Sequence, residues 1–370
     1  MANSIQQVEM CEAFKKAGRH VHLVHPSYRS IYSPTKWKDV EQYYAVEEEF
    51  QITTVPSLNG TSVDAPRLRL LSMVGSMASW LIYHTVNGDI GGDDIVYGRS
   101  YYPMFVYNEF RQQLPEGQRP TLVFEVHNSI SAHLKQRFYS SVDHIISITE
   151  KLKKRLVGAF GLPQNKISVE PDGVNYEYYQ DISKEKAREA VGIHADDSVV
   201  MYTGHLYPGK GVETLVKAAK QLDTSVYIVG GYQSDVERIK EEVGNPRNVT
   251  YTGFVNPTEV PTYQKAADIL VAPYTEQSRE WVSPLKLFEY MAAGRPIVAS
   301  DRQVLAEVLT HRKNALVFEK GNANALRQTV TELLDNKELY NEISHQVQQD
   351  VQRYRWEERA RRIIETINAL

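Results

Sequence analysis

A glutamate lies in a predicted helix that is otherwise built to pack on a sheet. Residues 283–301 read SPLKLFEYMAAGRPIVASD and predict a helix followed by a buried strand. Ser283 suits a helix cap and Pro284 the first helical position. The apolar stripe for the sheet is Leu285, Phe288 and Met291. Free N–H groups at the helix start would suit a phosphate, and Glu289 would suit sugar hydroxyls. Taken alone, Glu289 is better explained as a solvated surface residue.

A second stretch, YTGHLYPGKGVETL at 202–215, has the features of a phosphate-binding loop. A predicted strand ends at Gly204, and the loop holds His205, Lys210 and Gly211 before a predicted helix. Glycines let a backbone approach a ligand closely, and a lysine at a helix start can bind phosphate as a point charge. A glycine-rich turn with a solvent-facing lysine explains this pattern equally well.

Two further elements lie at the ends of predicted strands. His127 follows the strand in VFEVHNS (123–129), and PDGVN (171–175) forms a tight turn. Ligands of parallel sheets bind at the carboxyl ends of the strands. A lone histidine is nevertheless more often a structural residue.

Strand and helix patterns alternate along the whole chain, which predicts parallel sheets with helices on both faces. Strands are predicted at 20–26, 121–128, 144–149, 198–204, 225–231, 248–255, 269–274, 296–300 and 314–319. Helices are predicted at 4–17, 151–160, 210–222, 260–267 and 283–294, and two more follow the last strand. We expect two doubly wound, Rossmann-like domains that face each other across a cleft, with a boundary near residue 180.

The start of the chain departs from this pattern. A doubly wound domain normally opens with a central strand, whereas this chain opens directly with a predicted helix. We therefore expect the N-terminal domain to lack its first strand. Either the chain is truncated or misannotated at its start, or another segment fills the slot in the sheet.

The length, charge and cysteine count of the chain exclude several classes of protein. It has 370 residues, enough for two domains, and its formal charge of −4 gives no basic field for nucleic acid. A single cysteine, Cys11, excludes an internal disulfide framework and suits a reducing compartment.

Residues 1–16 lack the pattern of a signal peptide. The most apolar window, 68–83, is shorter than the ~20 residues needed to cross a bilayer. We interpret it as a buried helix, with docking on a membrane surface as the alternative.

Taken in order, these elements resemble the retaining glycosyltransferases of family 4, which have the GT-B fold. The family pattern Gly-Arg-Leu-x-x-x-Lys-Gly corresponds to 204–211, Pro-Asn-Gly-Val-Asp to 171–175, and Glu-x-His to 125–127. The family's Glu-x7-Glu helix corresponds to the opening stretch, with Glu289 as its second glutamate. The resemblance covers nearly the whole chain.

The resemblance implies transfer of a sugar from a nucleoside diphosphate, with retention of anomeric configuration, to a glycan, lipid-linked or small-molecule hydroxyl. It implies no metal and no other cofactor. The implied donor-binding residues are Gly204, His205, Lys210, Phe254, Val255, Ser283, Pro284, Leu285, Lys286 and Glu289. The implied catalytic residues are His127, Lys210 and Glu280. The family places residues 1–180 on the acceptor side and 181–357 on the donor side, with the C-terminal helix 358–370 crossing back to the first domain.

Two positions differ from the family pattern. Strict spacing puts Trp281 where the family has its first glutamate, and Glu280 precedes it by one residue. Either Glu280 takes that role through a bulged loop, or sugar recognition differs. His205 replaces the family's arginine, so a titratable group stands in place of a permanent charge.

Other classes of function remain open from the sequence. One is a GT-B epimerase or hydrolase of nucleotide sugars, and another is a non-catalytic subunit that binds a nucleotide sugar. The pair Asp93-Asp94 lacks the Asp-x-Asp spacing of a metal site, so we expect it to be structural. The basic run 151–155 could contact an anionic membrane, although a solvated helix face explains so short a run better. We expect a cytoplasmic location, with the inner face of the membrane as a possible variant.

Overall fold

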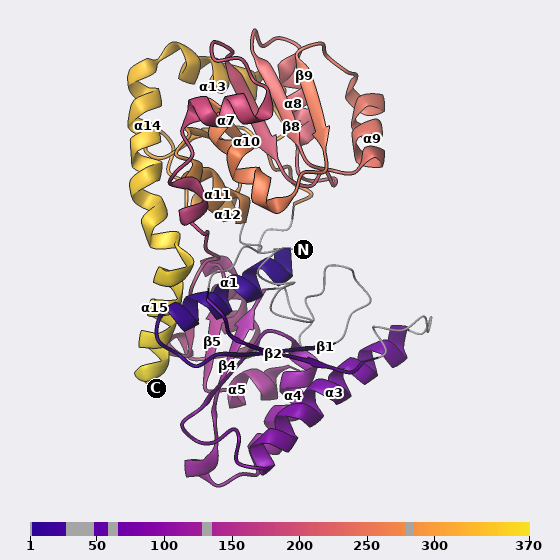
Figure 1. The fold of residues 1–370 in the computed structure, drawn as a ribbon, viewed down its shortest axis with the longest axis vertical. Helices are drawn as coiled ribbons and strands as arrows, with labels where there is room; N and C mark the ends of the chain where they lie inside the picture. Colours follow the sequence, from indigo (N-terminus) through magenta and orange to yellow (C-terminus); the bar gives the residue numbers. More distant parts are fainter. Residues whose placement is uncertain (1, 27–47, 58–65, 128–134, 279–284) are drawn as a thin grey trace. The chain divides into compact units, whose positions relative to one another are not determined.

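The computed structural model describes residues 2–26, 48–57, 66–127, 135–278 and 285–370 (Figure 1). The chain forms two compact units. The first unit comprises Met1–Pro171 with Arg359–Leu370, and the second comprises Asp172–Glu358. The division follows Pro171, slightly before the boundary near residue 180 that the sequence predicts, and the last twelve or so residues belong to the first unit.

The second unit is built on one six-stranded parallel sheet. Its strands are β7 (Val199–Thr203), β8 (Ser225–Val229), β9 (Val249–Gly253), β10 (Ile269–Ala272), β11 (Ile297–Ser300) and β12 (Leu316–Phe318). They are hydrogen-bonded in the order β12-β11-β10-β7-β8-β9, and each of these pairs is parallel. The three central strands β11, β10 and β7 are buried throughout, as expected for apolar strands covered on both faces.

Helices in two layers cover this sheet (Figure 1). One layer holds α8 (Val212–Ala219), α9 (Gln233–Val243) and α13 (Ala323–Asp335), which pack together. The other holds α7 (Lys184–Val191), α10 (Val260–Ala266), α11 (Leu285–Ala293) and α14 (Lys337–Asp350). The short α12 (Gln303–Ala306) follows β11.

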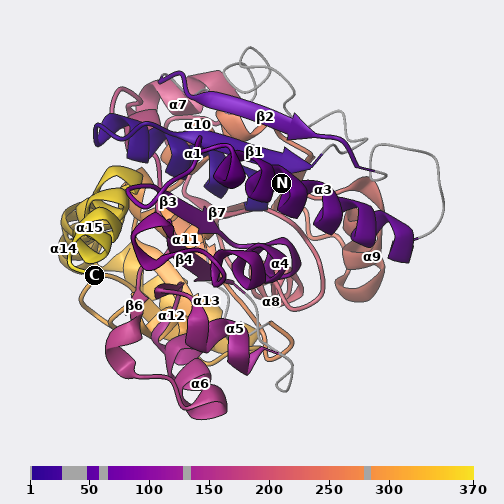
Figure 2. The ribbon, with the colours of Figure 1, turned by 90° about the horizontal axis from the view of Figure 1, so that it is seen from below.

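The first unit contains two separate parallel sheets within the part of the chain that is described. One has the order β3-β4-β5-β6, and the other pairs β1 with β2, which run side by side in Figure 2. The strands are β1 (His22–Pro26), β2 (Gln51–Val55), β3 (Ile95–Gly98), β4 (Thr121–Val126), β5 (His144–Ser147) and β6 (Ile167–Val169). The helices are α1 (Ala2–Lys16), α3 (Pro66–Val86), α4 (Tyr101–Arg111), α5 (Gln136–Ser141), α6 (Glu150–Phe160) and α15 (Trp356–Asn368). Among the described residues, no strand pairing joins β1 and β2 to the sheet of β3 to β6.

The basic run 151–155 lies on an amphipathic helix, α6. Thr149 caps the helix by accepting a hydrogen bond from the N–H of Leu152, and Gly161 ends it with a φ of 61°. The buried face of α6 carries Leu152, Leu156 and Phe160. Lysines and an arginine on its other side form the solvated face that the sequence predicts.

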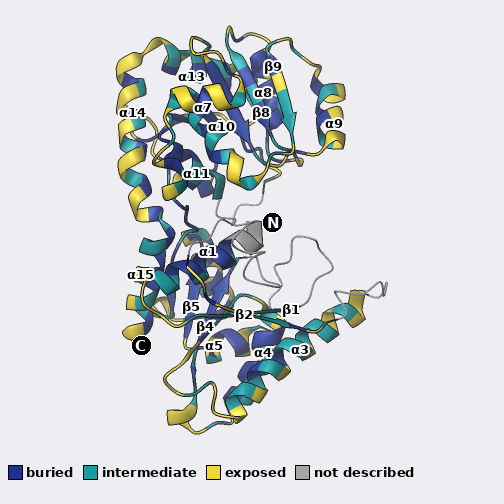
Figure 3. Ribbon diagram, in the orientation of Figure 1, coloured by how far each residue is buried: buried dark blue, intermediate teal, exposed yellow. Residues whose placement is uncertain are grey.

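The prediction of a buried helix at 68–83 is wrong. Only Ala78 and Leu81 of α3 are buried, whereas Leu68, Leu71 and Tyr83 are 54, 66 and 63% exposed (Figure 3). The helix packs through one narrow side, and high hydropathy does not reveal which sides of a helix are covered. No helix in the described residues is long and apolar enough to cross a membrane.

Two other sequence expectations have clear outcomes. Three helices, α13, α14 and α15, follow β12, where the sequence predicts two. Asn336 divides the first two, because its side chain accepts a hydrogen bond of 3.0 Å from the N–H of Leu339 and so caps α14.

Asp94 accepts a hydrogen bond of 2.8 Å from the N–H of Gly91, which is the structural role that we expected for it.

A buried ion pair ties α15 to the first unit. Arg359 is fully buried, and its Nη2 lies 3.0 Å from Oε2 of Glu125 on β4. Its Nε donates a hydrogen bond of 2.8 Å to the carbonyl oxygen of Pro171. Burial alone would raise the pKa of Glu125, but Arg359 and His127 hold that pKa well below its usual value.

We expect Arg359→Met to lower the free energy of unfolding by about 3–5 kcal/mol, because it leaves the charge of Glu125 buried without this partner. Thermal and urea unfolding would measure the loss. The matched control is Arg361→Met on the same helix. Arg361 pairs with Glu365 at the surface, where such pairs contribute about 0–1 kcal/mol. Equal effects of the two substitutions would contradict this account of the ion pair.

The same pair predicts a pH dependence. Because the pKa of Glu125 is lowered in the folded state, its contribution to stability is complete above the unfolded-state pKa, about 4.3, and is lost as the pH falls toward the folded-state pKa. The stability difference between wild type and Glu125→Gln should therefore shrink on acidification below about pH 4. A difference that stays constant down to about pH 3 would argue against a lowered pKa.

Candidate functional site

Three glycines form the carboxyl edge of the sheet in the second unit. Gly204, Gly230 and Gly253 lie at the ends of β7, β8 and β9. The N–H of Gly204 donates to the carbonyl of Val229 at 2.8 Å, and the N–H of Gly230 donates to the carbonyl of Gly253 at 2.9 Å. A Cβ atom on Gly230 would lie 2.7 Å from the carbonyl oxygen of Gly204, closer than real contacts allow. The strand ends therefore pack so closely that no side chain fits at Gly230. Sequence reasoning missed Gly230, although two successive glycines at a strand end were a usable signal.

The loop at 204–211 packs against the end of β10. Gly211 has a φ of 75°, and a Cβ atom there would overlap the carbonyl oxygen of Pro273, so only glycine fits. The ring of His205, an exposed residue, stacks on that of Tyr207, with centroids 4.9 Å apart. Although much of the residue is exposed, partial removal of the imidazole from water and the charges of Lys210 and Lys286 lower the pKa of His205. The imidazole therefore favours the neutral form and does not supply an arginine's permanent charge.

Lys210 is not the solvent-facing residue of a simple turn. Its Nζ lies 5.0 Å from the centroid of the Tyr274 ring, and burial lowers the pKa of its ammonium group. Lys286, from the first turn of α11, lies 5.7 Å from the same centroid. The two lysines thus converge on one aromatic ring after β10.

Glu289 is held inside the second unit, which contradicts its interpretation as a solvated surface residue. Gln264 of α10 donates a hydrogen bond of 3.3 Å to Oε2 of Glu289. The amide of Gln264 also donates to Thr203 at 2.9 Å and accepts from Tyr179 at 2.7 Å, which fixes its orientation. Burial raises the pKa of Glu289, and the bond from Gln264 and the charge of Lys286 oppose that shift. Sequence reasoning missed Gln264 as a partner.

Helix α11 packs on the sheet through its buried side. Phe288 and Met291 of the predicted stripe are fully buried, whereas Leu285 is partly exposed. The hydroxyl of Tyr290 accepts a hydrogen bond of 2.9 Å from the backbone N–H of Thr203, the last residue of β7. The helix therefore carries Lys286 and Glu289 at the end of the central strand.

The remaining donor-site predictions divide into two groups. Phe254 and Val255 directly follow β9 at the same sheet edge, and Phe254 is 51% exposed. Ser283, Pro284 and Glu280, together with Trp281, lie outside the described residues.

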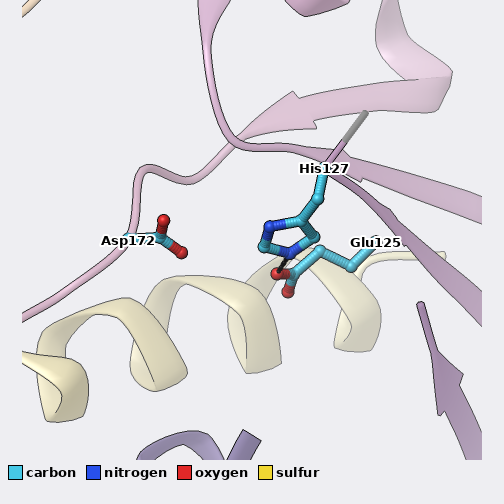
Figure 4. Close-up of side chains that lie close together, drawn as sticks. All are labelled: Glu125, His127 and Asp172. Carbon is cyan, nitrogen blue, oxygen red and sulfur yellow. Dashed lines mark hydrogen bonds and ion pairs between the residues drawn. The ribbon is translucent and has the colours of Figure 1, made fainter. Parts of the chain in front are cut away.

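In the first unit, His127 directly follows β4 and pairs through Nε2 with Oε1 of Glu125 (Figure 4). The side chain of His127 is 17% exposed, and that of Glu125 is 2% exposed. Oε1 of Glu125 also accepts a hydrogen bond of 2.7 Å from Gln6, while Oε2 accepts from Tyr97 and contacts Arg359. Both carboxylate oxygens are therefore occupied, and Glu125 orients the imidazole. Figure 4 also draws Asp172, which belongs to the second unit.

Two protein-family models together match most of the chain. The family model for glycosyl transferases group 1 matches residues 183–350, and the model for Glycosyltransferase Family 4 matches residues 6–178. An uncharacterised glycosyltransferase of Methanocaldococcus jannaschii is 27% identical over 60% of this chain and 58% of its own length. A lipopolysaccharide 1,2-N-acetylglucosaminetransferase of Salmonella typhimurium is 25% identical over 71% of this chain and 70% of its own. The chain spans about half the length of several curated relatives that it matches.

Solved structures share the fold at low sequence identity. The HepE protein of Anabaena, in complex with UDP, superposes with a TM-score of 0.73 at 17% identity, covering 99% of this chain and 96% of its own. Sucrose-phosphate synthase of Thermosynechococcus elongatus superposes with a TM-score of 0.74 at 20% identity, covering 97% and 91%. The two family models, the paired parallel-sheet units and these structures lead to one conclusion, that the chain belongs to the family 4 glycosyltransferases with the GT-B fold.

Proposed function

We propose that this protein is a retaining glycosyltransferase that moves a sugar from a nucleoside diphosphate to the hydroxyl group of a glycan, lipid-linked or small-molecule acceptor. The observation that carries the proposal is the convergence of Lys210 and Lys286 on Tyr274, next to the partly buried Glu289. Two cations suit a diphosphate, and a carboxylate suits ribose hydroxyls. Gly204, where a Cβ atom would lie 3.0 Å from Nζ of Lys286, brings backbone without a side chain next to them, which suits close approach of a ligand.

Each group then has a distinct task. Lys210 stabilises the negative charge that develops on the leaving diphosphate, which is electrostatic catalysis. Glu289 accepts hydrogen bonds from the ribose, and backbone groups of Phe254 and Val255 hold the base. His127, oriented by Glu125, is the catalytic residue that the first unit contributes. The complexes of HepE with UDP and UDP-glucose support UDP as the first nucleotide to test.

We propose that no metal ion takes part in donor binding. The lysines supply the positive charge that a divalent cation would otherwise bring to a diphosphate. In the first unit, Glu125 already uses both oxygens on protein donors, which leaves it little capacity as a metal ligand.

The first prediction concerns Lys210. Lys210→Met should weaken UDP binding about ten- to a hundredfold, because a charge-assisted hydrogen bond to phosphate is lost. Titration calorimetry would measure this change. Lys240→Met is the matched control, since Lys240 of α9 lies 5.1 Å from the ring of Tyr251, a similar contact on the edge strand β9. The role of Lys210 would be rejected if both variants bound UDP as wild type does.

The second prediction concerns Glu289. Wild type should bind UDP about tenfold more tightly than 2′-deoxy-UDP, because the deoxy nucleotide lacks the hydroxyl that donates a hydrogen bond to the charged carboxylate. Glu289→Leu should lose this preference, because the leucine has no acceptor. Gln264→Leu is a useful companion, since it removes the residue that orients Glu289 and should reduce the preference only in part. A variant at Glu289 that still discriminates between the two nucleotides would disprove its role at the ribose.

The third prediction concerns the reaction. With a competent acceptor, the product should keep the anomeric configuration of the donor, as read from the coupling constant of the anomeric proton by NMR. Rates with and without EDTA should be equal. An inverted product would refute the retaining mechanism. Donor consumption without acceptor would favour an epimerase or hydrolase, and donor binding without turnover would favour a non-catalytic subunit.

A further inference from the structure

Helix α3 of the first unit presents an uncharged stripe to solvent. Five of the twelve large hydrophobic residues that are exposed in the described part of the chain lie on this one helix. The stripe consists of exposed residues that recur every three or four positions: Leu68, Leu71, Gly75, Ser79, Tyr83 and Val86. At about 100° per residue, these positions fall within about 120° of the helix surface. A solvated helix face normally carries charged residues, so this stripe has the character of a contact surface.

The spacing of the stripe reads the same in both directions. Its intervals along the chain are three, four, four, four and three residues. A second copy of α3 that runs antiparallel therefore brings Val86 to the level of Leu68, and Tyr83 to the level of Leu71. A two-fold interface uses the same surface on both copies, so it requires a surface that is complementary to itself. The stripe meets this requirement.

The centre of the stripe suits the close approach of another helix. Gly75 and Ser79 have the smallest side chains of the stripe, and they lie at the same level in an antiparallel pair. A Cβ atom on Gly75 would have nothing within 4 Å, so the space over this residue is open. A lipid surface would gain more from large apolar side chains at the centre than from a glycine and a serine.

The two ends of α3 carry opposite charges. The first turn contains Arg67 and Arg69, and the whole helix contains no aspartate or glutamate. Asp89, 58% exposed, follows the helix and pairs with Nδ1 of His84 at 2.7 Å, and the exposed Asp93 follows it. An antiparallel copy places the basic start of one helix near the acidic turn of the other, which favours association. An anionic bilayer would instead repel the carboxylates at that end.

We propose that the protein forms a two-fold symmetric dimer in which α3 packs antiparallel against α3 of a second copy. Helix α4 packs beside α3 and adds the exposed side chains of Tyr102 and Val106. Since α3 has 21 residues, the helix pair is about 32 Å long. This length gives an interface at the small end of the specific range, so the dimer should exchange with monomer at micromolar concentrations. The inference is independent of the proposed donor site, which belongs to the second unit.

Sedimentation equilibrium of the whole chain, from about 1 to 100 µM, tests the dimer. The average mass of wild type should rise from the 42.2 kDa of one chain toward twice that value. Leu71→Lys and Tyr83→Glu should each weaken association about tenfold or more, because each leaves an uncompensated charge in an apolar contact. Leu70→Lys is the matched control. Leu70 is 41% exposed but lies about 160° around the helix from the stripe, so this variant should dimerise as wild type does.

The antiparallel register allows a rescue experiment. Combining Leu71→Lys with Tyr83→Glu places opposite charges at the same level in the dimer, so the double variant should regain most of the association that each single variant loses. The two positions are about 18 Å apart along α3, too far to pair within one copy. Gly75→Leu has room in the monomer and should preserve or raise the thermal midpoint of unfolding. It should nevertheless weaken association about tenfold, because the side chain holds the two helices apart.

Four outcomes would overturn the inference. The first is a wild type that stays monomeric at every concentration. The second is association that neither Leu71→Lys nor Gly75→Leu changes, since the contact would then lie elsewhere. The third is a double variant as weak as the single variants, which would contradict the antiparallel register. The fourth is a monomeric wild type that pellets with vesicles of phosphatidylglycerol and phosphatidylcholine, while Tyr83→Glu does not, which would assign the stripe to a lipid surface.

Discussion

Repulsion between Lys210 and Lys286, which share the ring of Tyr274, is the constraint on which the proposed donor site depends. Burial lowers the pKa of both ammonium groups, and the charge of Lys210 lowers that of Lys286 further, so holding these like charges away from water costs free energy. Aromatic faces and Glu289 offset only part of it. A ligand that brings two or more negative charges removes the remainder. On the proposed function, a bound diphosphate would offset this cost.

The frame of the second unit makes this arrangement possible. Parallel strands bring their carboxyl ends to one edge, so loops that are distant in sequence meet there. Glycines let the strand ends and the loop at 204–211 pack closely, and the hydrogen bond between Tyr290 and Thr203 holds α11 against β7. In the first unit, the contacts of Glu125 fix the side chain of His127. Arg359 and Tyr97 saturate one oxygen of Glu125, which leaves the other to orient His127.

The sequence predicts those parts of the structure that depend on local patterns. Apolar runs mark the buried strands, and a threonine and a glycine mark the ends of α6. The partners of Glu289 could not be predicted, because Gln264 is 25 residues away and no local periodicity marks it. Exposure of α3 was mispredicted for a related reason, since hydropathy does not state which elements cover a helix. Lys286 was predicted to bind the donor, but the contact of its side chain with the Tyr202 ring arises only when β7 and α11 meet, and no local pattern marks it.

The most direct test of the central claim is a crystal structure of the chain in complex with UDP. The account predicts the diphosphate between the ammonium groups of Lys210 and Lys286, the ribose hydroxyls on Glu289, and the uracil beside Phe254 and Val255. Binding of UDP elsewhere on the chain, or a diphosphate that contacts neither lysine, would contradict it.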